Sequence, residues 1–188
     1  MATDPTAEPG MPAQPSLAAG PIVLRPWREA DRAALLDAGR DPAIARWAGL
    51  PQPFGATEAA AYLAEARSLW DEGARAAFAI VETAGGSPVG AVTRFGPDGH
   101  RATIGCWVAA GVRARGVGST AIRALTDWTF ATTAAVRVEA FLLAGNAAAE
   151  RMMARAGFTR EGVLRAWEPG PDGAPADVVA WSRLRDDP

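Results

Sequence analysis

The chain has 188 residues, of which 49% are hydrophobic and 21% are charged, and its formal net charge is −2. This composition is typical of a folded globular protein with one full core, and the charge balance disfavours nucleic acid as a partner. All 19 basic residues are arginines, which excludes a phosphate loop of the Walker type, because that loop needs a lysine.

Residues 1–20 are rich in proline and alanine and contain no apolar stretch long enough for a signal sequence. We predict a disordered tail here, followed by a single domain over 21–188. No run approaches the roughly 18 apolar residues of a membrane span, so we expect no membrane association and a location in the cytoplasm. The single cysteine, Cys106, lies in an apolar run and is interpreted as a buried hydrophobic residue.

The first half of the domain is predicted to contain a strand, two helices and then a run of strands. Residues 21–26 have the pattern of a short strand, and 27–41 have helical spacing. A second helix follows, with Thr57 as its N-cap and Gly73 at its end. Three strand-like runs come next, at 75–83, 88–95 and 101–110. Turn-prone segments separate these runs, which predicts an antiparallel meander.

The second half of the domain changes this order. The patterns predict a helix over 116–131, a strand over 136–143, a helix over 146–156 and two strands over 157–167 and 177–184. A meander followed by a strand–helix–strand crossover predicts an α/β (α+β) fold, with a mixed and mostly antiparallel central sheet flanked by helices.

The segment VRARGVGSTA, residues 112–121, stands between a predicted strand and a predicted helix. Gly116 and Gly118 allow a tight turn there, but unpaired N–H groups at a helix start also form a natural anion site. A dinucleotide fold is a further interpretation, because GVGSTA fits G-x-G-x-x-A and Glu139 follows about twenty residues later. That fold is disfavoured, because six residues separate Ala109 from Gly116 and the preceding strands form a meander.

The same loop resembles the pyrophosphate loop of the GNAT acetyltransferases, Arg/Gln-x-x-Gly-x-Gly/Ala, residue for residue over 113–118. IGCWVA resembles the fourth strand of that family, NAAAERMMARAGF its Asn-containing fourth helix, and FTREGVLR the strand that follows. The opening segment IVLRPWREADRAALLDAGRDPAIARW and the closing segment DVVAWSRLRD resemble the branch that acetylates the N-termini of ribosomal proteins. The resemblance covers roughly residues 21–187.

This resemblance implies an N-acetyltransferase that uses acetyl-CoA and no metal. It also implies that the sheet splays apart between the family's fourth and fifth strands, with the pantetheine arm lying between them. The implied cofactor-binding residues are Trp107, Val108, Arg113, Ala114, Arg115, Gly116, Val117, Gly118, Ser119 and Asn146. Within this set the loop amides would hold the pyrophosphate, and Asn146 would both cap its helix and contact the cofactor.

The acid–base residues of the family are not all present. Ala149 stands where this branch has a serine, and Met153 stands where other branches have a tyrosine. Glu139 is the candidate base, because it is a charged residue inside an apolar strand; the alternative is that it faces solvent or pairs with an arginine. Glu161 is a second candidate.

The acceptor is expected to be a primary amine, preferably an α-amine of a protein N-terminus or peptide, or a small-molecule amine. Two alternatives remain open at this point: an acyl-CoA-binding protein with weak or no catalysis, and transfer of a different acyl group. A homodimer is also left open. Four tryptophans, Trp27, Trp47, Trp70 and Trp167, are candidates for an apolar acceptor slot, or for the core.

Overall fold

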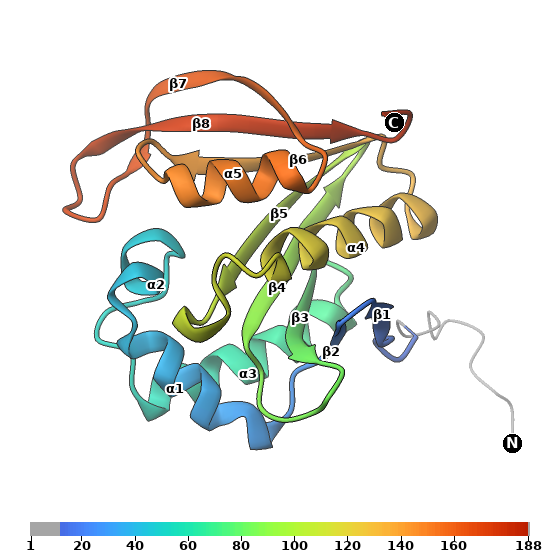
Figure 1. Ribbon diagram of the computed structural model, residues 1–188, viewed down its shortest axis with the longest axis vertical. Helices are drawn as coiled ribbons and strands as arrows, with labels where there is room; N and C mark the ends of the chain where they lie inside the picture. The colour runs from blue at the N-terminus through green and yellow to red at the C-terminus, as the bar shows by residue number, and fades with distance from the viewer. Residues whose placement is uncertain (1–11, 188) are drawn as a thin grey trace, which may run out of the picture.

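The computed structural model describes residues 12–187, and all strands in this part of the chain belong to one eight-stranded sheet in the order β1-β2-β3-β4-β5-β6-β8-β7 (Figure 1). The strands are β1 Leu17–Ala19, β2 Ile22–Pro26, β3 Arg75–Glu82, β4 Gly90–Asp98, β5 Arg101–Val108, β6 Arg137–Leu143, β7 Thr159–Pro169 and β8 Pro175–Leu184. The helices are α1 Arg32–Arg40, α2 Pro42–Trp47, α3 Ala56–Asp71, α4 Val117–Thr132 and α5 Ala147–Arg155. Two short 3-10 helices, Glu29–Asp31 and Ala110–Val112, precede α1 and follow β5.

The strand pairing confirms the predicted mixed sheet. β3, β4 and β5 form the predicted antiparallel meander, and α4 then carries the chain to β6, which pairs with β5 in parallel. The last two strands form an antiparallel hairpin, and β8 also pairs antiparallel with β6. One parallel pair therefore joins the N-terminal strands to the C-terminal ones.

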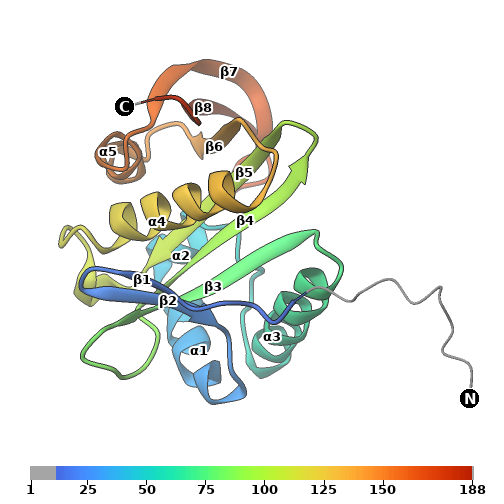
Figure 2. The same ribbon diagram turned by 90° about the vertical axis from the view of Figure 1, so that its right-hand side faces the viewer.

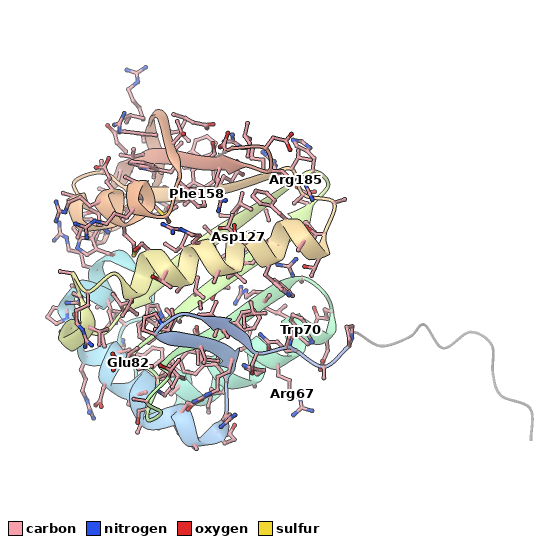
Figure 3. All side chains as sticks on the ribbon, turned by 45° about the vertical axis from the view of Figure 1, so that its right-hand side comes forward. Arg67, Trp70, Glu82, Asp127, Phe158 and Arg185 are labelled. Atoms are coloured by element: carbon pink, nitrogen blue, oxygen red, sulfur yellow. The ribbon has the colours of Figure 1, made fainter. Side chains whose placement is uncertain are left out.

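The predicted tail is wrong in its last part. Leu17–Ala19 form β1, which pairs antiparallel with β2 at one edge of the sheet. Just before β1, the carbonyl of Pro12 accepts a hydrogen bond of 2.9 Å from the indole of Trp70, a residue labelled in Figure 3. Residues 1–11 of the predicted tail lie outside the described residues.

The start of α3 also differs from the prediction. The helix begins at Ala56, and its N-cap is Gly55, whose N–H donates to the carboxylate of Glu58 at 2.8 Å. Thr57 is therefore already inside the helix and is not its cap. The predicted end is confirmed, because Gly73 follows the helix with a left-handed φ of 70°.

Helices cover both faces of the sheet. Figure 2 shows α4 on one side of β1–β3 and α1 and α3 on the other. Ile122 and Leu125 of α4 are buried against the main core, and Leu35 of α1 packs with Leu63 of α3 in a second, smaller cluster. Within residues 12–187, no helix has both the length and the apolar character needed to cross a bilayer.

Arg185 ties the C-terminal end of the chain to the end of α4. Its guanidinium donates to the carbonyls of Phe130 at 2.7 Å and Thr133 at 2.9 Å, and also to that of Ala135. The last carbonyls of a helix have no partner within the helix, so Arg185 satisfies groups that would otherwise stay unpaired. This contact fixes α4 at the end opposite to the glycine-rich loop.

We expect Arg185→Ala to lower the free energy of unfolding by about 2 kcal/mol, because hydrogen bonds from a charged donor are lost and the helix carbonyls are left unpaired. Urea denaturation measures this change. Arg160→Ala is the control, because within residues 12–187 the Arg160 side chain forms a single ion pair, an exposed one of 3.4 Å with Glu150. Its loss should cost about 0.5 kcal/mol or less. Equal losses in the two variants would contradict the role of Arg185.

Candidate active site

The parallel ladder between β5 and β6 is short. It contains only the pairs Arg101↔Arg137, Ala102↔Val138 and Thr103↔Glu139. Beyond these pairs both strands continue, to Val108 and Leu143, without pairing with each other. The two halves of the sheet therefore separate in a V, as the resemblance to the GNAT family implied, and Figure 1 shows the strands diverging.

The register determines which main-chain groups face this V-shaped gap. Ala109 N–H donates to Val89 C=O at 2.8 Å, on the β4 side. Since successive residues of a strand point their N–H and C=O groups to opposite neighbours, Trp107 also faces β4, whereas Cys106 and Val108 face the gap. The main-chain contacts expected of Trp107 and Val108 with the cofactor remain predictions, and of these two residues only Val108 faces the gap.

The loop at the open end of the gap leads directly into α4. Gly116 is the N-cap residue, with a φ of 83°, and Ala114 also has a positive φ, of 62°. No side chain caps α4, so the N–H groups of its first residues are free of helical and capping partners. The N–H of Ser119 belongs to this set, while its hydroxyl donates to Gly116 C=O at 3.0 Å inside the loop.

The two loop arginines bind carboxylates on different elements. Arg113 donates through Nε to Val108 C=O at 3.2 Å and through Nη2 to Asp41, the N-cap residue of α2. Arg115 donates to Glu82 at 2.9 Å, at the end of β3, where Figure 3 labels Glu82. Both arginine side chains therefore hold the loop against neighbouring elements. The sequence had predicted a contact of this loop with a phosphate, but not these ion pairs.

Helix α5 borders the gap on the β6 side. The prediction that Asn146 caps this helix is confirmed, because its Oδ1 accepts the Ala149 N–H at 3.1 Å. A Cβ on Gly118 would lie 2.4 Å from Met152 Sδ, so the missing side chain lets α4 approach α5 closely. Met153 is 1% exposed and belongs to the core, so it lies away from the gap.

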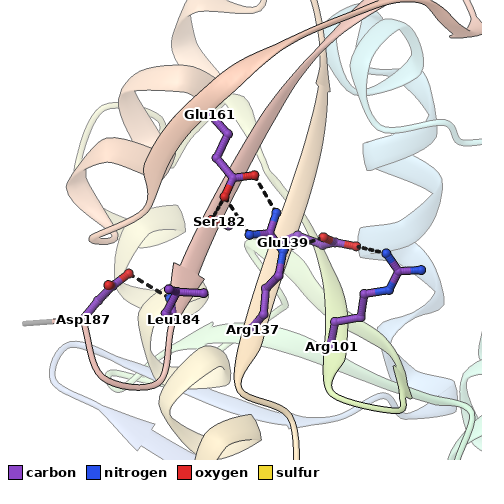
Figure 4. Close-up of polar contacts among 7 residues, drawn as sticks. All are labelled: Arg101, Arg137, Glu139, Glu161, Ser182, Leu184 and Asp187. Atoms are coloured by element: carbon purple, nitrogen blue, oxygen red, sulfur yellow. Dashed lines mark hydrogen bonds and ion pairs between the residues drawn. The ribbon is translucent and has the colours of Figure 1, made fainter.

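Glu139 is held by two arginines at the closed end of the gap (Figure 4). Its Oε2 accepts from Arg137 Nε at 2.9 Å, and its Oε1 lies 3.9 Å from the guanidinium of Arg101. Of the two roles considered from sequence, this geometry supports the ion pair. Both oxygens of Glu139 therefore face guanidinium groups, one from β6 and one from β5.

Glu161, the second candidate, belongs to the same network. Both of its oxygens accept from Arg137, each at 2.6 Å, and Ser182 donates to Oε1 at 2.6 Å. The hydrogen bonds from Arg137 and then from Ser182 lower the pKa of Glu161 to about 2. Glu161 is therefore ionised at neutral pH and links β7 and β8 to β6.

Aromatic side chains lie on the sheet face opposite α4. Trp27 contacts Tyr62 edge-on at 5.5 Å between ring centroids and lies 6.4 Å from Trp107. Burial raises the pKa of Tyr62 to about 12, so its hydroxyl stays protonated. On the C-terminal half, Phe141 stacks with the exposed Trp167 at 6.4 Å.

Of the four tryptophans considered for an acceptor slot, Trp70 and Trp47 lie in other places than Trp27 and Trp167. Trp70 is 5% exposed and packs on Trp128 in the main core, so the core alternative holds for it. Trp47, at the end of α2, is half-buried with the guanidinium of Arg46 over its ring at 4.7 Å.

Two cavities lie near these elements. One of about 220 Å³ adjoins the closed end of the gap and is lined in part by Phe95, Thr103 and Glu139. The other, of about 580 Å³, lies between β1 and α4 and includes Thr120 and Trp128 in its lining. Cys106 is unpaired, and burial raises the pKa of its thiol to about 12, which agrees with its interpretation as a hydrophobic residue. Residues 12–187 contain no cluster of side chains able to hold a metal ion.

Comparisons with known proteins agree with this arrangement. The acetyltransferase (GNAT) domain family matches residues 22–159. Among solved structures, RimJ of Mycobacterium smegmatis, in complex with CoA-disulfide, is 23% identical with a TM-score of 0.80, covering 93% of this chain and 89% of its own. RimL, a ribosomal-protein α-N-acetyltransferase in complex with CoA, is 19% identical with a TM-score of 0.81, covering 93% and 100%. The microcin self-immunity acetyltransferase MccE, in complex with acetyl-CoA and AMP, is 18% identical with a TM-score of 0.78, covering 88% and 93%.

No curated protein matches the sequence. The family match covers well over half of the chain, and the solved structures share its fold. The chain belongs to the GNAT acetyltransferase family. It is an acyltransferase that takes its acyl group from acetyl-CoA.

The loop backbone gives a paired prediction on stability. Gly116→Ala should lower the free energy of unfolding by about 1 kcal/mol, because a Cβ at a φ of 83° is strained. Ala114→Gly should raise it by about 0.5 kcal/mol, because the relief of strain at a φ of 62° exceeds the entropy that glycine adds to the unfolded chain. Thermal and urea unfolding measure both changes. Shifts of the same sign would contradict this backbone.

The Glu161 network predicts a dependence of stability on pH. Its folded pKa of about 2 lies below the usual 4.5, so its contribution is present above pH 4.5 and is lost as the pH falls towards 2. The side chain is 40% exposed, so screening limits the effect to about 1 kcal/mol. Urea denaturation of wild type and Glu161→Gln should differ at pH 6 and converge near pH 2. A difference that is constant across this range would contradict the assignment.

Proposed function

We propose that this chain transfers the acetyl group of acetyl-CoA to a primary amine, with α-amines preferred, and that the gap between β5 and β6 is where the transfer occurs. The observation that carries the proposal is the placement of free main-chain groups. The gap has unpaired groups along its β5 edge, and the uncapped start of α4 stands at its open end. The structures of RimJ and RimL contain CoA, and that of MccE contains acetyl-CoA.

The pyrophosphate fits the start of α4. The amides of residues 113–119 and the positive end of the helix dipole suit an anion, and Gly116 and Gly118 leave the backbone open to it. Arg113 and Arg115 add positive charge beside the loop even though each already binds a carboxylate. We assign the phosphate contacts chiefly to main-chain N–H groups.

The pantetheine arm fits the β5 edge of the gap. Its two amides need partners with the spacing of a strand, and Cys106 and Val108 present their N–H groups at that spacing. Cys106 also presents its C=O, whereas the C=O of Val108 accepts from Arg113. As the amine attacks, negative charge develops on the thioester oxygen, and an N–H of this edge can stabilise it. Asn146, at the start of α5, lies at the other side of the gap, where a contact with the cofactor accompanies its capping role.

The leaving thiolate needs no dedicated acid. The two family positions for one hold Ala149 and Met153, and the second is buried in the core. A general acid contributes typically 10²–10⁴-fold, but a thiol titrates near 8.5 and leaves tolerably without help. The family assignment does not favour the alternative of a protein that only binds acyl-CoA.

A site without dedicated acid–base residues should select amines that are already neutral at the working pH. An α-amine with a pKa near 7.8 is about one-third neutral at pH 7.5, whereas a lysine amine near 10.4 is only about 0.1% neutral. The similarity to RimL, an α-N-protein acetyltransferase, supports a protein N-terminus as the acceptor, and the similarity to MccE, which acts in microcin self-immunity, supports an acceptor of another kind. We propose the protein N-terminus first, with action in the cytoplasm.

The test is release of free thiol from acetyl-CoA with a panel of amines, which includes peptides with a free α-amine and α-acetylated peptides with one lysine. At pH 7.5 we expect α-amines to react roughly 300-fold faster, and the ratio should fall to about 10-fold at pH 9.5 as lysine loses its proton. No thiol release with any amine, despite CoA binding in calorimetry, would overturn the proposal.

The missing hydroxyl has its own test. We expect Ala149→Ser to change the rate of thiol release by less than about threefold, because the thiolate leaves without an acid. Ala148→Ser, one position earlier on the same helix, is the control for a general effect of serine in α5. A gain of 10²-fold or more, for Ala149→Ser alone, would show that the lost acid limits this enzyme.

A further inference from the structure

We infer that the Asp41–Arg113 ion pair couples the cofactor loop to helix α2, so that CoA binding fixes the position of α2, and that Asp41 is a positioning residue. The inference rests on the proposed function, because it takes CoA to bind at residues 113–119. The two partners are 72 residues apart in sequence, and they join the loop after β5 to an element on the α1 side of the molecule.

Asp41 uses its two carboxylate oxygens for two purposes. Oδ1 caps α2 by accepting the N–H of Ala43 at 2.9 Å and that of Ile44 at 3.4 Å. Oδ2 accepts from Arg113 Nη2. Although burial raises the pKa of Asp41, the hydrogen bonds from Ala43 and Arg113 outweigh this and hold it below its usual value. The carboxylate is therefore ionised and only 14% exposed, whereas the Arg113 side chain is 38% exposed, so the pair is shielded from solvent on the Asp41 side only.

Arg113 contacts both the gap and α2 with one rigid guanidinium. Nε donates to Val108 C=O at 3.2 Å, and Val108 is the residue whose main chain faces the gap near its open end. Because the guanidinium is planar, a shift of the Val108 carbonyl or of the loop changes the direction in which Nη2 points. A ligand that fixes the loop therefore also fixes Arg113 Nη2, whose hydrogen bond Asp41 accepts.

Helix α2 has few other constraints. It is six residues long, and Ile44 is its buried residue. Among the described elements, its extensive packing is against α1 alone. Figure 1 shows α2 beside the loop that follows β5. A helix this short is not stable by itself, so its position depends on its cap, on Ile44 and on the ion pair.

This arrangement predicts coupling between the two substrates. The segment after α2 leads through residues 48–53 to Phe54, which packs against the small cluster that contains Leu35 and Leu63, as do the aromatic residues Trp27, Tyr62 and Trp107. CoA at the loop would therefore order the segment that borders this aromatic face. Coupling of binding free energies is reciprocal, so an acceptor held by this face would tighten CoA by the same factor.

The chain offers a matched control in the other loop arginine. Arg115 pairs with Glu82 at 2.9 Å and braces the same loop, but Glu82 belongs to β3 and not to α2. Glu82→Gln removes one carboxylate charge beside the loop, as Asp41→Asn does. Asparagine caps a helix about as well as aspartate, so Asp41→Asn keeps the cap of α2 while it removes the charge that binds Arg113.

The experiment is hydrogen exchange of the amides in residues 43–48, with and without saturating CoA, in the wild type, Asp41→Asn and Glu82→Gln. We expect CoA to slow this exchange about 10-fold in the wild type and in Glu82→Gln, and less than twofold in Asp41→Asn. Arg113→Gln should reduce the effect of CoA on exchange as much as Asp41→Asn does. Combining the two substitutions should reduce it no further than either one alone. The inference is overturned if CoA leaves α2 unchanged in the wild type, or if it slows exchange equally in Asp41→Asn.

Kinetics and calorimetry separate this inference from the proposed function. With the peptide that releases thiol fastest, Asp41→Asn should raise the KM for the peptide about fivefold or more and change the Kd of CoA less than the KM. A merely structural role would lower stability without a CoA-dependent change in α2. If calorimetry detects no CoA binding in any of the proteins, the proposed function itself is overturned, and the coupling with it.

Discussion

The early end of the parallel ladder between β5 and β6 is the constraint on which the rest of the structure depends. Three residue pairs hold the two halves of the sheet together, and the strands then part with main-chain groups exposed along the β5 edge. Unpaired N–H and C=O groups inside a protein are costly, and a ligand with amide groups of its own can satisfy them. The fold thus creates a site for a peptide-like arm from backbone alone.

The surrounding elements keep this gap open and place the uncapped, positive end of a helix at its open end. Helix α4 crosses one face, with its far end fixed by Arg185 and its near end left uncapped at Gly116. Gly118 allows close contact with α5, so the two helices flank the gap without closing it. At the closed end, Arg137 binds both Glu139 and Glu161, which holds the C-terminal hairpin against β6.

Much of this could be predicted from sequence, and the exceptions have physical reasons. The loop motif, the Asn146 cap and the meander are local patterns, so short stretches of sequence reveal them. The role of Trp107 could not be assigned, because periodicity shows which face a side chain takes but not which neighbour its main chain meets. The pairing of Arg113 with Asp41 depends on tertiary contacts across 72 residues, and no local pattern signals it. Thr57 is a residue type that often caps helices, but the helix already begins at Ala56, with Gly55 as its N-cap and Glu58 accepting the Gly55 N–H.

In the proposed complex, CoA lies along the β5 edge with its phosphates at the start of α4. Amide chemical shifts during titration with CoA test this position, with inorganic pyrophosphate as a partial ligand. We expect pyrophosphate to shift only the amides of residues 113–119. CoA should also shift the amides of Cys106 and Val108, while that of Trp107, which faces β4, should shift least. Shifts that leave β5 unchanged, or that gather at the cavity between β1 and α4, would contradict this position.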